Sequence, residues 1–198
     1  MLLYKIYEHS ISKKLETFPK ELCFILGGSD VTADNSKLME VITWISEFHG
    51  IEKIIFHITC GTSDNIEKIL PIKEISKRYH VRISTESKDE TLGKGKPEIL
   101  IVLGKSGRDE ITDAIIKIAK ENTDPSTITE ETLESHLLYN VNPDFVIKTG
   151  GSHLTDFLIW QSVYSELFFT DVNWSKFRRV DFLRALRDYQ SRKRNFGK

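Results

Sequence analysis

The chain has 198 residues, of which 39% are hydrophobic and 29% are charged, and its formal net charge is −1. Such a chain is expected to form one soluble domain with a real apolar core. No apolar run is long enough for a membrane-spanning helix, and the first residues lack a signal peptide's uninterrupted apolar stretch. Cys23 and Cys60 lie in apolar runs, which indicates reduced core residues and favours the cytoplasm.

Apolar periodicity predicts alternating strands and helices along the chain. Strand-like runs rich in β-branched residues lie at 21–26, 52–58, 80–85, 97–104 and 144–150. Helical spacing marks 1–18, 36–49, 108–121, 127–140, a stretch from about Leu154, and a basic helix and tail at 176–198, whereas 86–96 reads as an exposed loop. This alternation predicts an α/β fold, a single layered domain with a mostly parallel central sheet flanked by helices.

Charge is unevenly distributed. Residues 176–198 contain nine Lys or Arg and two Asp, so residues 1–175 carry a net charge of −8. Two explanations account for this basic end equally well. One is a solvated helix face, and the other is a binding site for an acidic partner, a membrane surface, nucleic acid or a diphosphate. Composition alone does not choose among them.

Glycine-rich loops follow three of the expected strands, at 26–36, 103–110 and 146–161. None has the spacing of a P-loop or a dinucleotide fingerprint. Backbone N–H groups at helix starts attract phosphate oxygens, and Arg108 and Lys148 add positive charge beside the glycines. Each loop alone reads as a plain turn, but three at one sheet edge favour an anion site.

Groups suited to catalysis are few. His57 and His153 could act as bases, although lone histidines are more often structural. Glu166 is an acid inside an otherwise apolar stretch of helical spacing, so it needs a cation, a metal or a donor unless it points outward. Neither metal-ligand clusters nor a nucleophile elbow is evident in the sequence.

Residues 144–177, "DFVIKTGGSHLTDFLIWQSVYSELFFTDVNWSKF", followed by a basic helix ending "RNFGK", resemble the cis-prenyltransferases, the undecaprenyl and dehydrodolichyl diphosphate synthases. Weaker likeness covers "LLYKIYEHSISKKLETFPKELCFIL", "IEKIIFHIT" and "LIVLGKSGRDEI". The resemblance implies condensation of isopentenyl diphosphate, in cis, onto an allylic diphosphate primer with Mg²⁺. It also implies a dimer whose C-terminal tails reach into the partner's active site.

The sequence departs from the family pattern after the first strand. The family carries an aspartate there that positions magnesium on the allylic diphosphate, and Gly27 stands at that position. Ser29 replaces an asparagine, Asp30 is displaced, and the arginines of the following segment are missing. The resemblance therefore assigns no catalytic residue to this chain.

A second departure lies in the loop after the fifth strand. Lys148 replaces the family's first arginine, so a point charge replaces a bidentate fork. Thr149, Gly150 and Thr155 fit the pattern, whereas Ser152 stands where the family has glutamate and the second arginine is missing. This implies a weakened diphosphate clamp.

Three further positions complete the comparison. Glu166 matches a family acid near the metal, which the resemblance makes a metal contact. The region 62–97 is too short for the helices that wall the family's product tunnel. At the C-terminus Asn195 replaces the arginine of a terminal motif, although Arg194 lies one residue earlier.

The resemblance thus implies two sets of residues. The substrate-binding set is Arg108, Lys148, Thr149, Gly150, Thr155, Arg194, Asn195, Phe196 and Gly197. The dimer-interface set is Phe157, Trp160, Tyr164, Phe168, Phe169 and Trp174.

The leading hypothesis is a non-catalytic accessory subunit similar to the Nogo-B receptor type. It would act in a heterodimer or heterotetramer with a catalytic cis-prenyltransferase that binds most of the Mg²⁺. The alternatives are a divergent homodimeric enzyme, active alone through Asp30 or Asp34, and a binding module outside prenyl chemistry. A cytoplasmic protein is expected. Attachment to a membrane surface and a homodimer in isolation stay open, and nucleic acid is not an expected partner.

Overall fold

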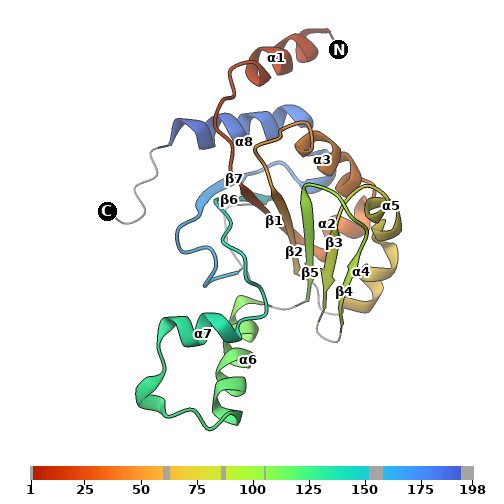
Figure 1. Cartoon of the computed structure of the whole chain (residues 1–198). Helices are drawn as coiled ribbons and strands as arrows, with labels where there is room; N and C mark the ends of the chain where they lie inside the picture. Colours follow the sequence, from red (N-terminus) through yellow and green to blue (C-terminus); the bar gives the residue numbers. More distant parts are fainter. Residues whose placement is uncertain (1, 60–62, 86–87, 105, 152–157, 193–198) are drawn as a thin grey trace.

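The computed structural model describes residues 2–59, 63–85, 88–104, 106–151 and 158–192 (Figure 1). Its centre is a seven-stranded sheet in the order β4-β3-β5-β2-β1-β6-β7. All neighbouring strands are parallel except the antiparallel pair of β3 and β4. The predicted α/β fold with a mostly parallel sheet is confirmed.

The five predicted strands are present within a few residues of their expected bounds. The strands are β1 Glu21–Gly27, β2 Lys53–Thr59, β3 Val81–Ser84, β4 Asp89–Leu92, β5 Glu98–Leu103, β6 Phe145–Thr149 and β7 Glu166–Thr170. β4 lies within the stretch expected to be a loop, where Arg82 of β3 binds Asp89 with an Nε–Oδ1 distance of 2.9 Å. The expectation of an irregular loop at 86–96 is therefore wrong for residues 89–92.

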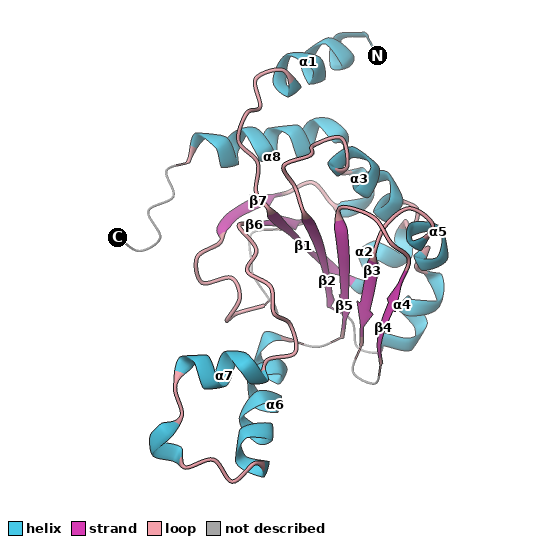
Figure 2. Ribbon diagram, viewed as in Figure 1, coloured by secondary structure: helices cyan, strands magenta, loops and turns pink. Residues whose placement is uncertain are grey.

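Most helices lie beside this sheet, whereas the pair α6 and α7 projects away from it (Figure 2). The helices are α1 Leu2–Ser12, α2 Gly28–Ala33, α3 Lys37–Ile45, α4 Ser63–Ile69, α5 Ile72–Ser76, α6 Gly107–Lys120, α7 Glu130–His136 and α8 Arg179–Ser191, with 3₁₀ turns η1 Pro125–Thr127 and η2 Trp174–Lys176. The first helix is shorter than the expected 1–18. The helix expected from residue 127 begins three residues later, because the hydroxyl of Thr129 accepts from the N–H of Thr132 and caps it. None of the helices within the described ranges is long and apolar enough to cross a membrane.

The helix expected from about Leu154 is not formed by the part of it that the structure describes. Residues 159–164 make turns, and β7 follows as a parallel neighbour of β6. The apolar run suited either element, and contact between the rings of Phe145 and Phe168, 6.2 Å apart, favours the strand. Glu166 consequently lies at the start of a strand and not in a helix.

Side chains of alternate strand residues form two apolar clusters, one on each face of the sheet. Phe24 and Phe56 belong to the larger cluster, where their rings stack at 5.5 Å. Trp174 packs edge-on against Phe24 and is 0% exposed. Trp174 was predicted at a dimer interface, and that prediction is wrong because its ring fills the core beneath α8.

Cys23 belongs to the smaller cluster and is a buried free thiol, as expected of a core cysteine. Burial raises the pKa of this thiol to about 12, so the thiol stays protonated and unreactive. Cys60 lies outside the described residues.

Candidate functional site at the carboxyl edge of the sheet

The carboxyl ends of β1, β2, β5 and β6 lie along one edge of the sheet, because these strands are mutually parallel. Gly27 aligns with Thr59, and Lys148 aligns with Ile25 two residues before the end of β1. The three glycine-rich loops were expected at one edge, and the strand directions agree with that expectation. In parallel sheets this edge is where ligands bind.

The end of β1 carries a carboxylate although it lacks the family's aspartate. Asp30, in the first turn of α2, accepts a hydrogen bond from the N–H of Gly27 at 3.1 Å. A Cβ added at Gly27 would lie 3.2 Å from Oδ2 of Asp30. Asp30 therefore folds back over the backbone position from which an aspartate at residue 27 would project. Asp34 differs, since it accepts from the hydroxyl of Ser36 at 2.7 Å and belongs to a local turn.

The loop after β6 is held by backbone contacts to the turn after β7. The N–H of Gly150 donates to the carbonyl of Val172 at 3.1 Å, and the N–H of Gly151 donates to that of Thr170 at 3.3 Å. Gly150 and Gly151 have φ angles of +70° and +141°, conformations that favour glycine. This bracing fixes the direction in which the chain leaves β6.

The side chains of Lys148 and Thr149 lie on opposite faces of the sheet, so they do not form the paired diphosphate contact that was expected. The ammonium of Lys148 donates to the carbonyl of Thr149 at 2.9 Å, so it lies close to the glycine turn. Lys148 aligns through Ile25 with the completely buried His57 of β2, on the face that carries the smaller cluster. Thr149 faces the opposite side with a buried hydroxyl that has no hydrogen-bond partner among the described residues. Lys148 is therefore the more accessible of the two.

Arg108 is exposed in the first turn of α6, which Ser106 caps by accepting from the N–H of Asp109 at 3.1 Å. β5, which precedes α6, is separated from β6 by β2 and β1. At about 4.8 Å between neighbouring strands, β5 lies about 14 Å from β6. One diphosphate is too short to be held by both Arg108 and Lys148 without movement of their loops.

The predicted metal contact lies at the other end of the sheet. Glu166 aligns with Phe145 at the start of β6, and its Oε2 accepts from Arg192, the residue after α8, at 2.9 Å. Within the described residues, no group of three His, Cys, Asp or Glu is close enough to hold a metal. Asp30 lies at the carboxyl edge and belongs to no such group, so the described residues do not fit a complete magnesium site.

The remaining predicted interface residues differ in exposure. Phe168 packs on the larger cluster, Phe169 is partly exposed, and Tyr164 is 66% exposed. Trp160 donates its indole N–H to Oε1 of Glu134 at 3.2 Å. Several residues singled out in the sequence lie outside the described residues: His153, Thr155, Phe157, Arg194, Asn195, Phe196 and Gly197.

Comparison with known proteins decides the family. A family model described as "Putative undecaprenyl diphosphate synthase" matches residues 37–197. The chain belongs to this family, the cis-prenyltransferases.

Individual relatives in this family align with different shares of this chain. A protein of Methanocaldococcus jannaschii named tritrans,polycis-undecaprenyl-diphosphate synthase (geranylgeranyl-diphosphate specific) is 31% identical over 247 residues, 98% of this chain and 87% of the relative. An isoprenyl transferase of Thermus thermophilus is 46% identical over 110 residues, 50% of this chain and 41% of the relative. The first alignment is longer than this chain, so that relative contains segments that this chain lacks.

The fold comparison agrees. Lavandulyl diphosphate synthase from Lavandula x intermedia, solved in complex with dimethylallyl diphosphate, superposes with a TM-score of 0.73 at 20% identity. The match covers 91% of this chain and 98% of that structure. At this identity the likeness shows that the two chains share the cis-prenyltransferase fold.

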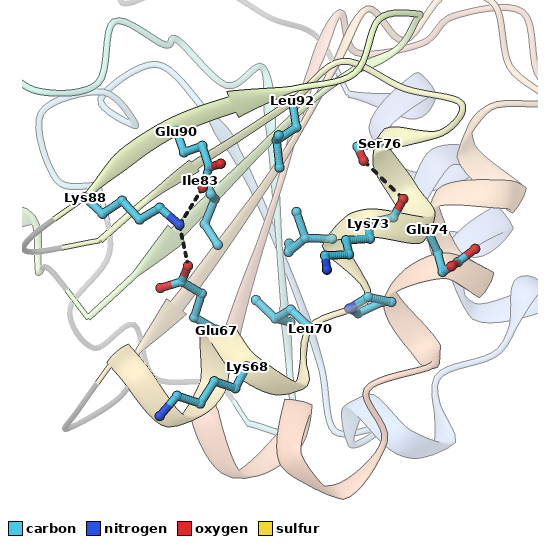
Figure 3. Close-up of a pocket in the computed structure, with 12 residues that line it drawn as sticks. Glu67, Lys68, Leu70, Lys73, Glu74, Ser76, Ile83, Lys88, Glu90 and Leu92 are labelled. Atoms are coloured by element: carbon cyan, nitrogen blue, oxygen red, sulfur yellow. Dashed lines mark hydrogen bonds and ion pairs between the residues drawn. The ribbon is translucent and has the colours of Figure 1, made fainter.

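A pocket of about 580 Å³ in this chain was not predicted from the sequence (Figure 3). It lies between α4, α5 and the β3–β4 hairpin, with Leu70 and Ile83 at its apolar wall. Lys88 bridges its rim by pairing with Glu67 at 3.0 Å and with Glu90. The hydrogen bond with Glu90 contributes most to raising the pKa of Lys88, and the one with Glu67 raises it further. The pocket depends on β4, whose short polar sequence gave no strand signal.

Proposed function

We propose that this cis-prenyltransferase family member is a non-catalytic accessory subunit. It would pair with a catalytic cis-prenyltransferase that makes polyprenyl diphosphate from isopentenyl diphosphate and an allylic primer. In this proposal the catalytic partner binds most of the Mg²⁺. The character of the chain is then that of the Nogo-B receptor type of subunit.

The observation that carries the proposal is the end of β1. Gly27 offers no side chain where the family's metal-positioning aspartate is expected, and the nearby carboxylate of Asp30 accepts from the N–H of Gly27. Ionisation of an allylic diphosphate needs cations to stabilise the leaving diphosphate. The described part of this edge provides Lys148 as a cation but no cluster of metal ligands.

Exposed apolar side chains support association with another subunit. Ile159, Val163, Tyr164 and Phe169 are exposed within and just before the edge strand β7. A cluster of this kind on a protein surface marks an interaction site. We assign Trp160, Tyr164, Phe168 and Phe169 to the subunit interface, together with Phe157 from the sequence.

The ion pairs of Arg179 and Arg192 occupy these cations within the chain, which leaves the basic residues of the tail, 193–198, as candidates for contact with diphosphate. Arg179 pairs with Glu8 and Glu47, and Arg192 pairs with Asp188 and Glu166. These cations of the helix serve the chain's own fold, and the sequence adds three more beyond Arg192: Lys193, Arg194 and Lys198. We propose that these residues, with the N–H groups of Asn195, Phe196 and Gly197, contact diphosphate in the partner's site.

The position of Asp30 favours a second candidate function. Its carboxylate lies over Gly27, within reach of the place where an aspartate at residue 27 would act. A divergent homodimer active alone, with Asp30 in place of the missing aspartate, is therefore the alternative.

One experiment separates the two functions. The chain is purified alone and together with each catalytic homologue from the same genome, and incorporation of labelled isopentenyl diphosphate into an allylic primer is measured. The accessory function predicts activity only for a pair, and an unchanged rate when Asp30→Asn is introduced into that pair. Activity of the chain alone, lost in Asp30→Asn, would establish the alternative.

A further inference from the structure

β4 forms one edge of the sheet, and in the described part of the chain no strand lies on the side that faces away from β3. The turn between β3 and β4 is closed by the N–H of Thr85, which donates to the carbonyl of Lys88 at 2.7 Å. Because hydrogen-bonded and non-hydrogen-bonded pairs alternate along an antiparallel ladder, the N–H and C=O groups of Asp89 and Thr91 point away from β3. An edge of this kind is a template for a further strand.

The pocket of about 580 Å³ lies along the same edge (Figure 3). Successive side chains of a strand point to opposite faces, so Glu90 and Leu92 share the face that lines the pocket. Leu70 and Ile83 form its buried apolar wall. Its volume falls within the range of about 300 to 1,000 Å³ found for ligand sites, so a large apolar side chain fits. Because the edge strand itself lines the pocket, side chains of a strand added beyond β4 would reach it.

The β3–β4 hairpin is held in place by contacts at two points. Arg82 binds Asp89 with an Nε–Oδ1 distance of 2.9 Å, on the face away from the pocket. Beyond β4, a Cβ added at Gly95 would lie 2.2 Å from the carbonyl oxygen of Arg78, so the backbone there packs directly against the turn after α5. The edge and the pocket are therefore preformed, which lowers the entropic cost of binding.

The charge at one end of the pocket favours a cation. Lys88 pairs with Glu67 at 3.0 Å and with Glu90, so two carboxylates share one ammonium. The side chains of Glu67 and Glu90 are 27% and 38% exposed. Lys68 extends away from this group, and Lys73 comes from α5 at the other end of the pocket (Figure 3). A Lys or Arg beside Glu90 on an added strand would therefore be attracted.

The composition of β4 argues against pairing with a second copy of itself. A second β4 would bring Asp89 and Glu90 to this edge and no cation, so two copies would repel each other here. β4 has only four residues, and short charged edges resist unspecific pairing. A short segment of complementary charge is the occupant that these features favour.

We propose that β4 binds an extended segment of another protein as an additional strand. The backbone of that segment pairs with the outward groups of Asp89 and Thr91. One apolar side chain enters the pocket beside Leu92, and a Lys or Arg two positions away lies beside Glu90. Main-chain hydrogen bonds supply affinity in this mode of binding, and the alternate side chains supply specificity. β4 and β7 lie at opposite edges of the sheet, so the inference does not depend on the accessory function.

Synthetic peptides test the proposal. The probes are fluorescein-labelled Thr-Leu-Thr-Lys-Thr and the reverse sequence Thr-Lys-Thr-Leu-Thr, which cover antiparallel and parallel addition. Their affinity for the full chain is measured by fluorescence anisotropy, and at least one is expected to bind with a Kd below about 1 mM. The same peptide with Glu in place of Lys should bind at least about tenfold more weakly, because it places a carboxylate beside Glu90.

Thr91→Pro distinguishes strand addition from binding in the pocket alone. Proline removes the outward N–H of residue 91, and it is tolerated in edge strands where that group faces solvent. Affinity for the peptide is expected to fall at least about fivefold in Thr91→Pro, since a main-chain hydrogen bond is lost. The matched control Thr91→Ala should bind within about twofold of the wild type.

Circular dichroism checks the folding of Thr91→Pro. If that variant does not fold, a peptide methylated at its backbone nitrogens is titrated into the wild-type chain and should bind at least about fivefold more weakly. Unchanged affinity of folded Thr91→Pro or of the methylated peptide overturns the proposal, as does the absence of binding at about 1 mM of either probe. NMR shifts confined to residues away from β4 would overturn it too. Each of these results leaves the accessory function intact.

Discussion

At the scale of single residues, His136 links α6 and α7, the two helices of a hairpin. Its Nε2 lies 3.0 Å from Oε2 of Glu121, the residue that ends α6 as its C-cap, and its Nδ1 lies 2.7 Å from the carbonyl oxygen of Thr132. The bond to that carbonyl, and then the one to Glu121, raise the pKa of His136 above its ordinary value of 6.5. The charged imidazolium is therefore the form that the folded hairpin favours.

A pH dependence follows from the sign of this shift. A raised folded-state pKa contributes stability that is fully present below the unfolded value, about 6.5, and is lost as pH rises through the folded value. Hydrogen exchange of the α7 amides, corrected for its intrinsic pH dependence, is expected to show stronger protection at pH 6 than at pH 8. Glu121→Gln should lower the pKa of His136 in an NMR titration and reduce this difference. Equal protection at both pH values in the wild type would contradict the expectation.

Trp174 gives a second residue-scale prediction, because it lies in the core and not at the interface. Trp174→Ala is expected to lower the free energy of unfolding by about 3 to 5 kcal/mol, the range for removing a large buried aromatic ring. Tyr164→Ala, at a highly exposed position, should change it by less than about 0.5 kcal/mol. Urea denaturation measures both. A stable Trp174→Ala variant that no longer bound the partner would restore Trp174 to the interface.

At the scale of elements, the strands show what the sequence could predict. β1, β2 and β5 were identified because they are apolar on both faces, which few other elements require. β7 was missed because "FLIWQSVYSELFF" is apolar in a way that suits a helix as well as a strand. β4 was missed because "DETL" has no apolar pattern, and its pairing depends on Arg82 and Asp89. Its formation depends on tertiary contacts that local periodicity does not encode.

In the candidate site, too, some features followed from the sequence and others depend on tertiary packing. Parallel strands place the loops at one edge, so the positions of Gly27, Lys148 and Arg108 along that edge followed from the sequence. The direction of side chains did not follow. Two contacts depend on residues brought together by packing: the hydrogen bond of Asp30 to the N–H of Gly27, and the edge-on contact of Trp174 with Phe24.

The β3–β4 hairpin supports an element-scale prediction about Gly93. This residue has a φ of +70°, and an added Cβ would lie 2.2 Å from the carbonyl oxygen of Ser76. Gly93→Ala must therefore move the hairpin away from α5 and should cost about 2 kcal/mol or more of unfolding free energy. Lys94→Ala, at the exposed neighbour, should cost less than about 0.5 kcal/mol.

Urea denaturation gives both free energies for the hairpin variants. Hydrogen exchange in β4 shows whether a loss at Gly93 is local, since the pocket wall formed by Leu92 would move with the hairpin. A Gly93→Ala variant as stable as the wild type would mean that the hairpin can leave α5 without cost.

At the scale of the whole molecule, paired charges and apolar surface lie in different places. Arg179 of α8 pairs with Glu8 of α1 and with Glu47, which lies just after α3, and Arg192, just after α8, pairs with Glu166 of β7. Most of the exposed apolar side chains lie on the α6–α7 hairpin and along residues 159–169, and the others are Ile6 and Tyr7 of α1. The contacts of α8 therefore serve the chain's own fold, while the α6–α7 hairpin and the residues before β7 leave apolar side chains exposed.

Removal of residues 194–198 tests this division directly. Arg192 and the ion pairs of α8 are retained, so the midpoint of thermal unfolding should stay within about 2 °C of the wild type, the shift that a change of under about 0.5 kcal/mol produces in a domain of this size. The basic residues Arg194 and Lys198 are lost with Asn195, Phe196 and Gly197. If the tail contacts diphosphate in the partner's site, partner-dependent activity falls by at least about tenfold, because cationic contacts to a developing diphosphate charge are removed. Binding to the partner, measured separately, should change far less, since the apolar surface is untouched. A truncated pair that turns over at the wild-type rate would instead confine the accessory role to the interface.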